Sequence, residues 1–461
     1  MPERIDFRPM MKPKSVAVIG ASRNPEKVGH IILQNFIKAG YDGEIYPINP
    51  NADEILGLRT YKAVGALKKA VDLAVIAIPA EEVPGVLEEC GRAKVKSAIV
   101  VSGGFAEVGR ADLQDSIAKI AKKYGIVLVG PNCLGVMDTR SRVNTLFLPS
   151  YKLSTPPVGN VSFITQSGAV GSTVIDVIAS ECIGLSKFIS YGNAAGVDET
   201  DLLDYLIRDE ETKVIVMYLE GIKRGREFVE VARRAAGIKP VVVLKAGKTS
   251  AGVTAAHSHT AALAGNYQVQ EAIFKQFGFT IANDLDELLY YAKIFASEIA
   301  PKGNRVAIIT NGGGAGVLTT DAIASSQKLV LGELSGKTKQ ELRKRMPPIV
   351  NIANPLDLAG DADAERYGNA LTLMGNDPNI DILIVITLFQ TPGADSKVAA
   401  ELAHQKESMD KPMLVISVGS EYTQLHKIML ESCGVPVYDS PNSATKSLEA
   451  LFRYARFKDK Y

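Results

Sequence analysis

The chain has 461 residues, 46% of them hydrophobic and 22% charged, and 52 Lys and Arg against 51 Asp and Glu leave a net charge of +1. This length suggests about three domains of roughly 150 residues each. The balanced charge argues against a nucleic-acid-binding chain, which would need a basic surface.

Cysteine usage and hydropathy exclude further classes. The four cysteines are widely spaced, with no CxxC pair (Cys90, Cys133, Cys182 and Cys433). Neither a disulfide framework nor a structural zinc site is therefore expected, and scattered thiols suit a reducing compartment. No apolar run is long enough for a membrane span, and Met1 to Lys14 lacks the apolar core of a signal peptide. We expect a cytoplasmic chain that contacts neither nucleic acid nor membrane.

Residues 1–149 are predicted to form a first domain in which short apolar strands alternate with helices. A helix is expected over Val28 to Ala39. The near-continuous apolar character of the strands indicates a parallel sheet covered on both faces. The predicted strands are Val16 to Ile19, Gly43 to Pro47, Leu73 to Ile78, Ser97 to Val101 and Ile126 to Val129.

Two more α/β domains are predicted, over residues 150–299 and 300–461. Proline-rich residues 149–157 and the stretch from Ala300 to Asn304 are the expected linkers, because proline denies strand pairing. The predicted strands are Val161 to Thr165, Ile189 to Tyr191, Val214 to Leu219 and Val241 to Leu244, then Arg305 to Thr310, Ile382 to Leu388, Met413 to Val418 and Val435 to Tyr438.

The first motif follows the first strand. Gly20-Ala21-Ser22-Arg23-Asn24-Pro25 is a turn whose backbone amides and following helix suit the phosphate of a nucleotide, with a plain turn as the alternative. It does not match the G-x-G-x-x-G dinucleotide pattern, and no acidic residue ends the second strand, which disfavours nicotinamide binding. The carboxyl ends of other strands in this domain are expected at the same edge of the sheet as this turn, where open sheets bind ligands. The candidate cofactor residues are Gly20, Ala21, Ser22, Asn24, Asn49, Pro50, Pro79, Ser102, Gly103, Gly104 and Asn132.

Each later domain also opens with a strand, a glycine-containing turn and a helix. Gln166, Ser167 and Gly168 lack the arrangement of a nucleophile elbow and suit an inorganic anion, with a plain serine cap as the alternative. In the third domain Gly313, Gly314 and Gly316 let amides approach an anion closely, without the lysine of a Walker loop.

A loop of small residues carries two of the five histidines, His257 and His259. H-x-H is a possible metal pair without a third ligand nearby, and an imidazole can also act covalently or as an acid or base. Glu220, directly after an apolar strand, is suited to orient such a ring. A structural role for the histidines and a solvated Glu220 stay open as alternatives.

Taken in order, these motifs resemble the α subunit of the ADP-forming (NDP-forming) acetyl-CoA synthetases, in the succinyl-CoA synthetase superfamily. The resemblance extends over the whole chain. It implies a Rossmann-like CoA-binding domain followed by two flavodoxin-like parallel-sheet domains. It is carried by Lys14 to Ser22, Gln166 to Ala169, Ser258 to Gly265, Thr310 to Gly314 and Asn354 to Leu358.

The resemblance implies that acetyl-CoA, phosphate and ADP are converted to acetate, CoA and ATP through acetyl phosphate and a phosphohistidine. The chain shows no ATP-grasp module. The resemblance therefore implies a separate β subunit that binds ADP or ATP with Mg²⁺, in an α2β2 heterotetramer. No metal site is expected on this chain itself.

The family pattern S-H-T-G-[SA]-L-A-G matches Ser258 to Gly265, which makes His259 the phosphohistidine and His257 a bystander, although Ala261 replaces the usual glycine. Glu220 matches the glutamate that holds the ring. The resemblance also implies that the helices after Gly168 and Gly314 direct their N-termini at the phosphoryl group. The alternative functions are a non-catalytic CoA-binding regulatory subunit and a nicotinamide-dependent oxidoreductase; a protein acyltransferase would need an additional domain.

Overall fold

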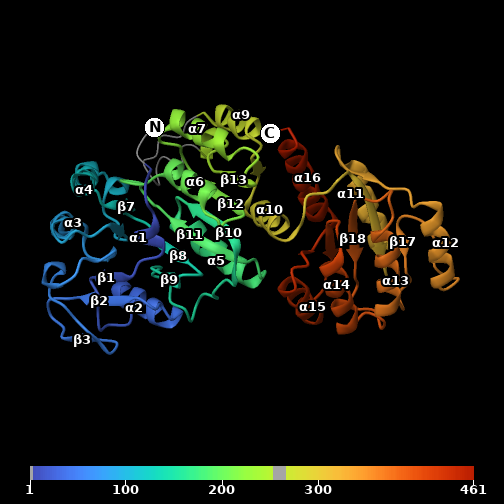
Figure 1. Ribbon diagram of the computed structural model, residues 1–461, viewed down its shortest axis with the longest axis horizontal. Coiled ribbons are helices and arrows are strands. Elements are labelled where there is room, and N and C mark those ends of the chain that lie inside the picture. The colour runs from blue at the N-terminus through green and yellow to red at the C-terminus, as the bar shows by residue number, and fades with distance from the viewer. Residues whose placement is uncertain (1–3, 253–265, 461) are drawn as a thin grey trace. The chain divides into compact units, whose positions relative to one another are not determined.

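The computed structural model describes residues 4–252 and 266–460, which form two compact units (Figure 1). Unit 1 combines Met1–Ser180 with Gly184–Asn283, and unit 2 combines Glu181–Ile183 with Asp284–Tyr461. Parallel sheets with helices between their strands dominate both units. The predicted α/β class is therefore confirmed.

The first sheet of unit 1 is entirely parallel and follows the predicted strands closely. Its strands run in the order β2 (Glu44–Ile48), β1 (Ser15–Ile19), β5 (Leu73–Ile76), β6 (Ser97–Val100) and β7 (Val127–Val129). The helices of this region are α1 (Arg8–Met11), α2 (Val28–Ala39), α3 (Val83–Arg92) and α4 (Ala111–Tyr124), and β3 (Glu54–Ile55) pairs with β4 (Leu58–Arg59) in a short hairpin.

The second sheet of unit 1 is mixed. Its order is β14 (Thr280–Ala282), β13 (Val241–Lys245), β12 (Val214–Leu219), β10 (Val158–Thr165), β11 (Leu185–Ser190), β8 (Gly135–Asp138) and β9 (Val143–Asn144). The edge strand pair β8 and β9, which the sequence pattern did not indicate, runs antiparallel to its neighbours. Its helices are α5 (Gly168–Ser180), α6 (Glu199–Arg208), α7 (Gly225–Ala235) and α9 (Tyr267–Gln276).

One hydrophobic core lies between the two sheets of unit 1, and a second core lies on the other face of the first sheet. Alternate residues of β1 enter different cores, with Val16 and Val18 in one and Ala17 and Ile19 in the other. The core that holds Val16 also contains residues of the second sheet, such as Ile164. Both faces of β1 are therefore buried, as predicted for a parallel strand.

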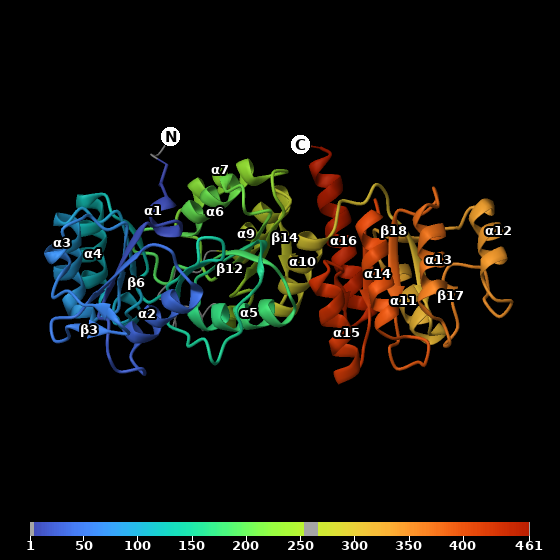
Figure 2. The same cartoon turned by 60° about the horizontal axis from the view of Figure 1, so that its bottom comes forward.

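Unit 2 contains one sheet, also parallel, with strand order β16 (Val330–Leu331), β15 (Arg305–Thr310), β18 (Ile382–Ile386), β19 (Met413–Ile416) and β20 (Val437–Tyr438), while β17 (Leu356–Asp357) pairs with β15. Figure 2 shows its helices flanking these strands. They are α10 (Leu285–Ser297), α11 (Gly313–Ser325), α12 (Gly336–Arg345), α13 (Ala364–Gly375), α14 (Ser396–Ser408), α15 (Glu421–Ser432) and α16 (Pro441–Lys458).

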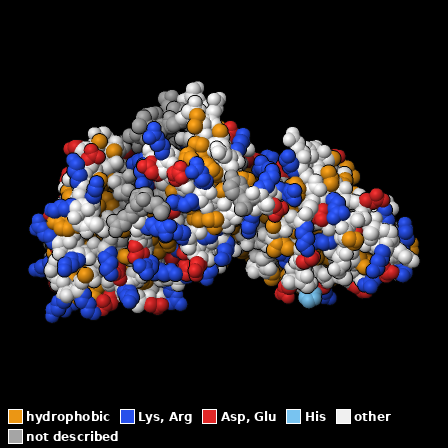
Figure 3. All heavy atoms as spheres, turned by 45° about the horizontal axis from the view of Figure 1, so that its top comes forward, with side chains coloured by type: hydrophobic (Ala, Val, Ile, Leu, Met, Phe, Trp, Pro, Cys, Tyr) orange, Lys and Arg blue, Asp and Glu red, His pale blue; other side chains and the backbone are white. Residues whose placement is uncertain are grey.

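The distribution of charge on the surface agrees with the balanced composition of the chain. On the face shown in Figure 3, Lys and Arg side chains are interspersed with Asp and Glu. Among the described helices, none combines the length and the apolar character needed to cross a membrane.

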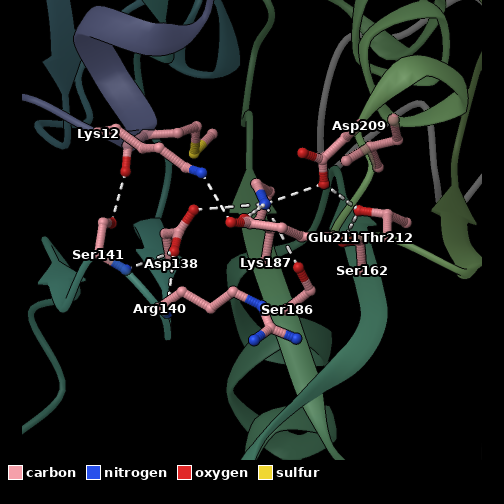
Figure 4. Close-up of polar contacts among 12 residues, drawn as sticks. Lys12, Asp138, Arg140, Ser141, Ser162, Ser186, Lys187, Asp209, Glu211 and Thr212 are labelled. Carbon is pink, nitrogen blue, oxygen red and sulfur yellow. Dashed lines mark hydrogen bonds and ion pairs between the residues drawn. The ribbon is translucent and has the colours of Figure 1, made fainter.

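A buried lysine explains why the sequence indicated only the end of β11. Lys187 lies in the middle of this strand and is 0% exposed, although lysine ordinarily indicates a solvent-exposed position. Its Nζ forms ion pairs with Asp209 at 2.9 Å, Glu211 at 2.7 Å and Asp138, its cross-strand partner, at 3.4 Å (Figure 4). The three carboxylates supply the compensation that a buried ammonium requires.

The cluster around Lys187 joins three parts of unit 1. Asp138 lies on the antiparallel strand β8, next to the sheet edge, and Asp209 and Glu211 lie between α6 and β12. Lys12, next to α1, donates to Glu211 at 2.7 Å. Burial lowers the pKa of Lys187, but the surrounding carboxylates outweigh burial and raise it above its usual value. The ammonium therefore stays charged at neutral pH.

Replacing Lys187 by Met should destabilise unit 1 strongly, because it leaves several carboxylates around an apolar side chain. Breaking a buried ion pair typically costs about 3–5 kcal/mol. Chemical denaturation at pH 7 should show this loss. The loss should shrink as the pH falls, because the carboxylates then become protonated and neutral. Lys12→Met is the matched control: it removes an ammonium from the same cluster, but one that is 50% exposed, and should cost under about 1 kcal/mol. An equal loss of unfolding free energy in the two variants would contradict the central role of Lys187 in the cluster.

Candidate functional site

A cavity of about 560 Å³ opens at the carboxyl ends of the first sheet's strands. The turn after β1 forms one wall, and residues that follow β5 and β6 form another. Of the predicted cofactor residues, seven line it: Gly20, Ala21, Ser22, Asn49, Pro79, Ser102 and Gly103. The structure thus brings together residues that lie more than 80 positions apart in the sequence.

Two glycines bring the turn and helix α2 into close contact. Gly20 has φ +87°, which a glycine adopts without strain. A Cβ on Gly29, in the first turn of α2, would overlap the carbonyl oxygen of Gly20. The Asn49 side chain donates to the carbonyl of Ala21 at 2.7 Å, and His30 Nδ1 lies 2.8 Å from the Ser22 carbonyl. These contacts hold the turn against the helix N-terminus, an arrangement suited to a phosphate.

Four other predicted cofactor residues, Asn24, Pro50, Gly104 and Asn132, are not among those that line the cavity. Asn24 caps the turn, because its Oδ1 accepts from the Glu26 N–H at 2.9 Å. The Gly104 N–H donates to Glu107, and the Asn132 side chain donates to Asn193 at 3.2 Å. In this structure Asn24, Gly104 and Asn132 therefore form hydrogen bonds within and between loops.

Several residues that line the cavity were not predicted from the sequence, and Lys27 and Phe147 are the most informative of them. Lys27 directly precedes α2, and a cation next to a phosphate-type turn was a usable signal. Nothing in the sequence around Phe147 indicated that it would line the cavity. Asn35 of α2 donates to the carbonyls of Leu146 at 2.7 Å and Leu148 at 3.0 Å, which holds the segment bearing Phe147 against this domain.

A second group of predicted residues meets at the carboxyl ends of β10 and β12, which are neighbours in the second sheet. Thr165 ends β10, and its hydroxyl donates to the Ser167 carbonyl at 2.9 Å and accepts from the Ser167 N–H at 3.1 Å. The Ser167 hydroxyl accepts from the Val170 N–H at 3.3 Å. Ser167 therefore caps α5, as the plain interpretation of this turn held, and Gly168 begins the helix.

Gln166 connects this turn to Glu220. Its side-chain Oε1 accepts hydrogen bonds from the main-chain N–H groups of Glu220 and Gly221, the latter at 2.9 Å. Gln166 thus fixes the start of the loop after β12. Glu220 is 5% exposed, which contradicts the alternative of a solvated glutamate. Burial and the nearby Glu220 carboxylate raise the pKa of Tyr218 to about 12.

Unit 2 repeats the same local structure with different side chains. Thr310 ends β15 and exchanges hydrogen bonds with Gly312, both at 3.0 Å. The next residue, Asn311, pairs with the main chain of Leu388 after the neighbouring strand β18, accepting from its N–H at 2.9 Å. Thr310 and Asn311 therefore correspond to Thr165 and Gln166, which confirms the expected recurrence of strand, turn and helix.

The glycines of the unit 2 turn begin α11, with Gly313 as its first residue and Gly314 and Gly316 in its first turn. One acidic side chain lies beside them: a Cβ on Gly313 would come within 2.7 Å of an Asp357 oxygen. An anion bound at this turn would need the Asp357 charge to be compensated.

The two candidate nucleophiles, His257 and His259, lie outside the described residues. The described chain ends on one side at Gly252, after β13, and resumes at Asn266, the cap of α9. Strand β13 is the neighbour of β12, so the described residues Ala246 to Gly252 follow the strand that lies next to the one preceding Glu220.

Three protein-family models match the chain in sequence order. Residues 14–139 match a CoA-binding domain, residues 158–295 a succinyl-CoA ligase-like flavodoxin domain, and residues 306–460 a ligase-CoA domain. The cavity lies in the first match, and Gln166 and Glu220 lie in the second. The expected CoA-binding domain with two further parallel-sheet domains is therefore confirmed.

Relatives carry the same arrangement as a separate subunit and as part of longer chains. The α subunit of acetate–CoA ligase (ADP-forming) II of Pyrococcus furiosus is 41% identical over 96% of this chain and 97% of its own length. The 4-hydroxybutyrate–CoA ligase (ADP-forming) of Nitrosopumilus maritimus is 35% identical over 97% of this chain, which spans 64% of that relative.

A solved structure has the same fold over almost the full length. The dinucleotide-forming acetyl-coenzyme A synthetase 1 of Ca. Korarchaeum cryptofilum, in complex with phosphate and ADP, superimposes with a TM-score of 0.91 and 37% identity, covering 98% of each chain. With the ordered domain matches and the Pyrococcus relative, this likeness shows that the chain belongs to the α subunits of the ADP-forming acyl-CoA synthetases.

Proposed function

We propose that the chain is the α subunit of an ADP-forming acetyl-CoA synthetase, which converts acetyl-CoA, phosphate and ADP to acetate, CoA and ATP. One observation carries the proposal: Gln166 locks a buried glutamate, Glu220, at the carboxyl edge of a sheet, in a chain whose first domain has a phosphate-type cavity. This arrangement supports a cofactor site together with an acidic group that can orient a histidine.

The cavity of the first domain is proposed to bind CoA. Backbone amides of Gly20 to Ser22 and the N-terminus of α2 are suited to its phosphates, with Lys27 as a nearby cation. Pro79, Ser102 and Gly103 form the opposite wall, and Phe147 adds apolar surface. Asn24, Pro50, Gly104 and Asn132 are proposed to shape the surrounding loops.

The turn formed by Gln166, Ser167 and Gly168 is proposed to bind phosphate. Phosphate attacks the thioester carbonyl, the carbon–sulfur bond breaks, and CoA leaves as the thiol after taking up a proton. The amides at the start of α5 stabilise the anion. The product is acetyl phosphate.

His259 is proposed to take the phosphoryl group. Its unprotonated ring nitrogen attacks phosphorus, the bond to the acetyl oxygen breaks, and acetate leaves. The proton on the other ring nitrogen is held by Glu220, which fixes the tautomer. Gly313, Gly314 and Gly316 are proposed to offer amides to the phosphoryl group on its way to ADP.

ADP and Mg²⁺ are proposed to bind to a β subunit with an ATP-grasp domain, in an α2β2 assembly. The name of the Pyrococcus relative, a subunit α, and the part of the longer Nitrosopumilus relative that lies outside the match support such a partner. Acetate is the proposed acid because the Pyrococcus and Korarchaeum proteins are named for it. The Nitrosopumilus enzyme makes 4-hydroxybutyrate the competing substrate to assay.

Incubating the chain with its β partner, ATP and Mg²⁺ should produce an acid-labile, base-stable phosphoprotein. His259→Asn should abolish this labelling, because it removes the proposed nucleophile. His257→Asn is the matched control and should retain most turnover. Undiminished labelling of His259→Asn would overturn the assignment, and CoA binding without labelling of the unaltered chain would favour a non-catalytic CoA-binding subunit.

Gly29→Ala should weaken CoA binding by about tenfold, because its methyl group must push α2 away from the Gly20 carbonyl. Overpacking of this kind costs about 1–3 kcal/mol, and 1.4 kcal/mol is a factor of ten in affinity. Isothermal titration with CoA gives the dissociation constant. Gly85→Ala is the matched control, since Gly85 also lies on a helix of this domain and its added methyl group would meet nothing within 4 Å. Unchanged affinity of Gly29→Ala would place CoA elsewhere.

A further inference from the structure

Lys245, the last residue of β13, is a buried cation with no role in the function proposed above. The residue is 1% exposed. Its Nζ donates to the main-chain carbonyl of Glu220 at 2.8 Å and to that of Ala246 at 2.5 Å. Burying an ammonium costs several kcal/mol unless it is well compensated. Its position at the sheet edge beside Glu220 therefore points to a function.

The peptide groups of Glu220 are held from two sides. Gln166, from the turn after β10, accepts from the Glu220 N–H, and Lys245, from β13, donates to the Glu220 carbonyl. The Ala246 N–H also donates to the carbonyl of Leu219 at 2.9 Å. Both strands next to β12 thus contribute to the position of Glu220.

Lys245 also affects Glu220 through its charge. The Glu220 carboxylate acts electrostatically on three described titratable groups of the neighbouring strands, Lys245 on β13, Tyr218 on β12 and Tyr191 after β11. Burial raises the pKa of both tyrosines, so the phenols stay neutral. Burial lowers the pKa of Lys245 and the nearby Glu220 opposes this shift. Among these three side chains, Lys245 is the one that can carry a positive charge.

We propose that Lys245 is a positioning residue for Glu220: its ammonium holds the Glu220 main chain opposite Gln166 and keeps the carboxyl ionised. The inference rests on the proposed function, in which an ionised Glu220 holds the ring of His259. A nearby positive charge favours the ionised carboxylate, and an ionised carboxylate accepts the ring N–H and so leaves the other nitrogen free to attack.

The test is the rate at which the full chain is labelled by acetyl [³²P]phosphate, measured from pH 5 to pH 9. Lys245→Met removes both the charge and the hydrogen bonds and should slow labelling about 10- to 100-fold, as expected for a residue that orients a reacting group. The acid limb of the profile should also move to higher pH, because the Glu220 carboxyl takes up a proton more readily without the ammonium. A purely structural role would lower the rate equally at every pH.

Two further variants separate the contributions of Lys245. Lys245→Gln keeps an N–H donor without the charge, and its acid limb should move as in Lys245→Met while its plateau rate is higher. Lys245→Gln also takes the place of Lys245→Met in the test if Lys245→Met does not fold. Lys248→Met is the matched control: Lys248 lies three residues further on and donates to the carbonyl of Asn283 at 3.1 Å, and its variant should be labelled like the unaltered chain.

CoA binding, measured in parallel, separates a failure of the proposed function from a failure of the proposed role of Lys245. The Lys245 variants should bind CoA normally, because the cavity lies in the first sheet. Absence of labelling in the unaltered chain would reject the proposed function. Labelling of the unaltered chain together with an unshifted acid limb in Lys245→Met and Lys245→Gln would overturn the role of Lys245 alone.

Discussion

The parallel arrangement of the strands is the constraint on which the rest of this molecule depends. Parallel strands all end at one edge of their sheet, where the chain must turn and leave main-chain groups without ladder partners. In this protein side chains satisfy those groups: Asn49 holds the turn after β1, Gln166 the start of the loop after β12, and Asn311 that after β18. Each candidate binding turn is therefore closed by an amide or hydroxyl next to it, and the remaining amides at the helix N-termini are available for anions.

Two fully buried lysines show how the same side chain serves different purposes. Lys187 is surrounded by carboxylates that raise its pKa despite burial, so it binds the antiparallel strand β8 and the segment after α6 into unit 1. The hydrogen-bond partners of Lys245 are carbonyl oxygens, which carry only partial charges, and burial lowers its pKa. The first is an internal ion-pair cluster, and its Asp209 and Glu211 lie just before the amino end of β12. The second lies at the sheet edge beside Glu220, where the proposed chemistry needs a positive charge.

Much of the fold could be read from residue patterns, and the exceptions have physical causes. Apolar β-branched runs located most of the strands, because a strand buried on both faces must be apolar throughout. The first half of β11 was not predicted from the sequence, because Lys187 interrupts its apolar run. The strand pair β8 and β9 at the edge of the second sheet was not predicted, because both strands are short and their residues follow no regular hydrophobic pattern. The two turns at Thr165 and Thr310 were recognised as similar, but the roles of Gln166 and Asn311 in bonding to the neighbouring strand depend on which strands lie side by side.

The sequence by itself determined the α/β class, the order of the motifs and the family, because these depend on local residue types and their order along the chain. Only the tertiary structure decided which residues share a site. Phe147 reaches the cavity because Asn35 holds its segment, Asn132 bonds to Asn193 and does not line the cavity, and Lys245 meets Glu220 because β13 pairs with β12. These contacts join residues that are distant in sequence, and their geometry is set by strand order and packing, which no local pattern specifies.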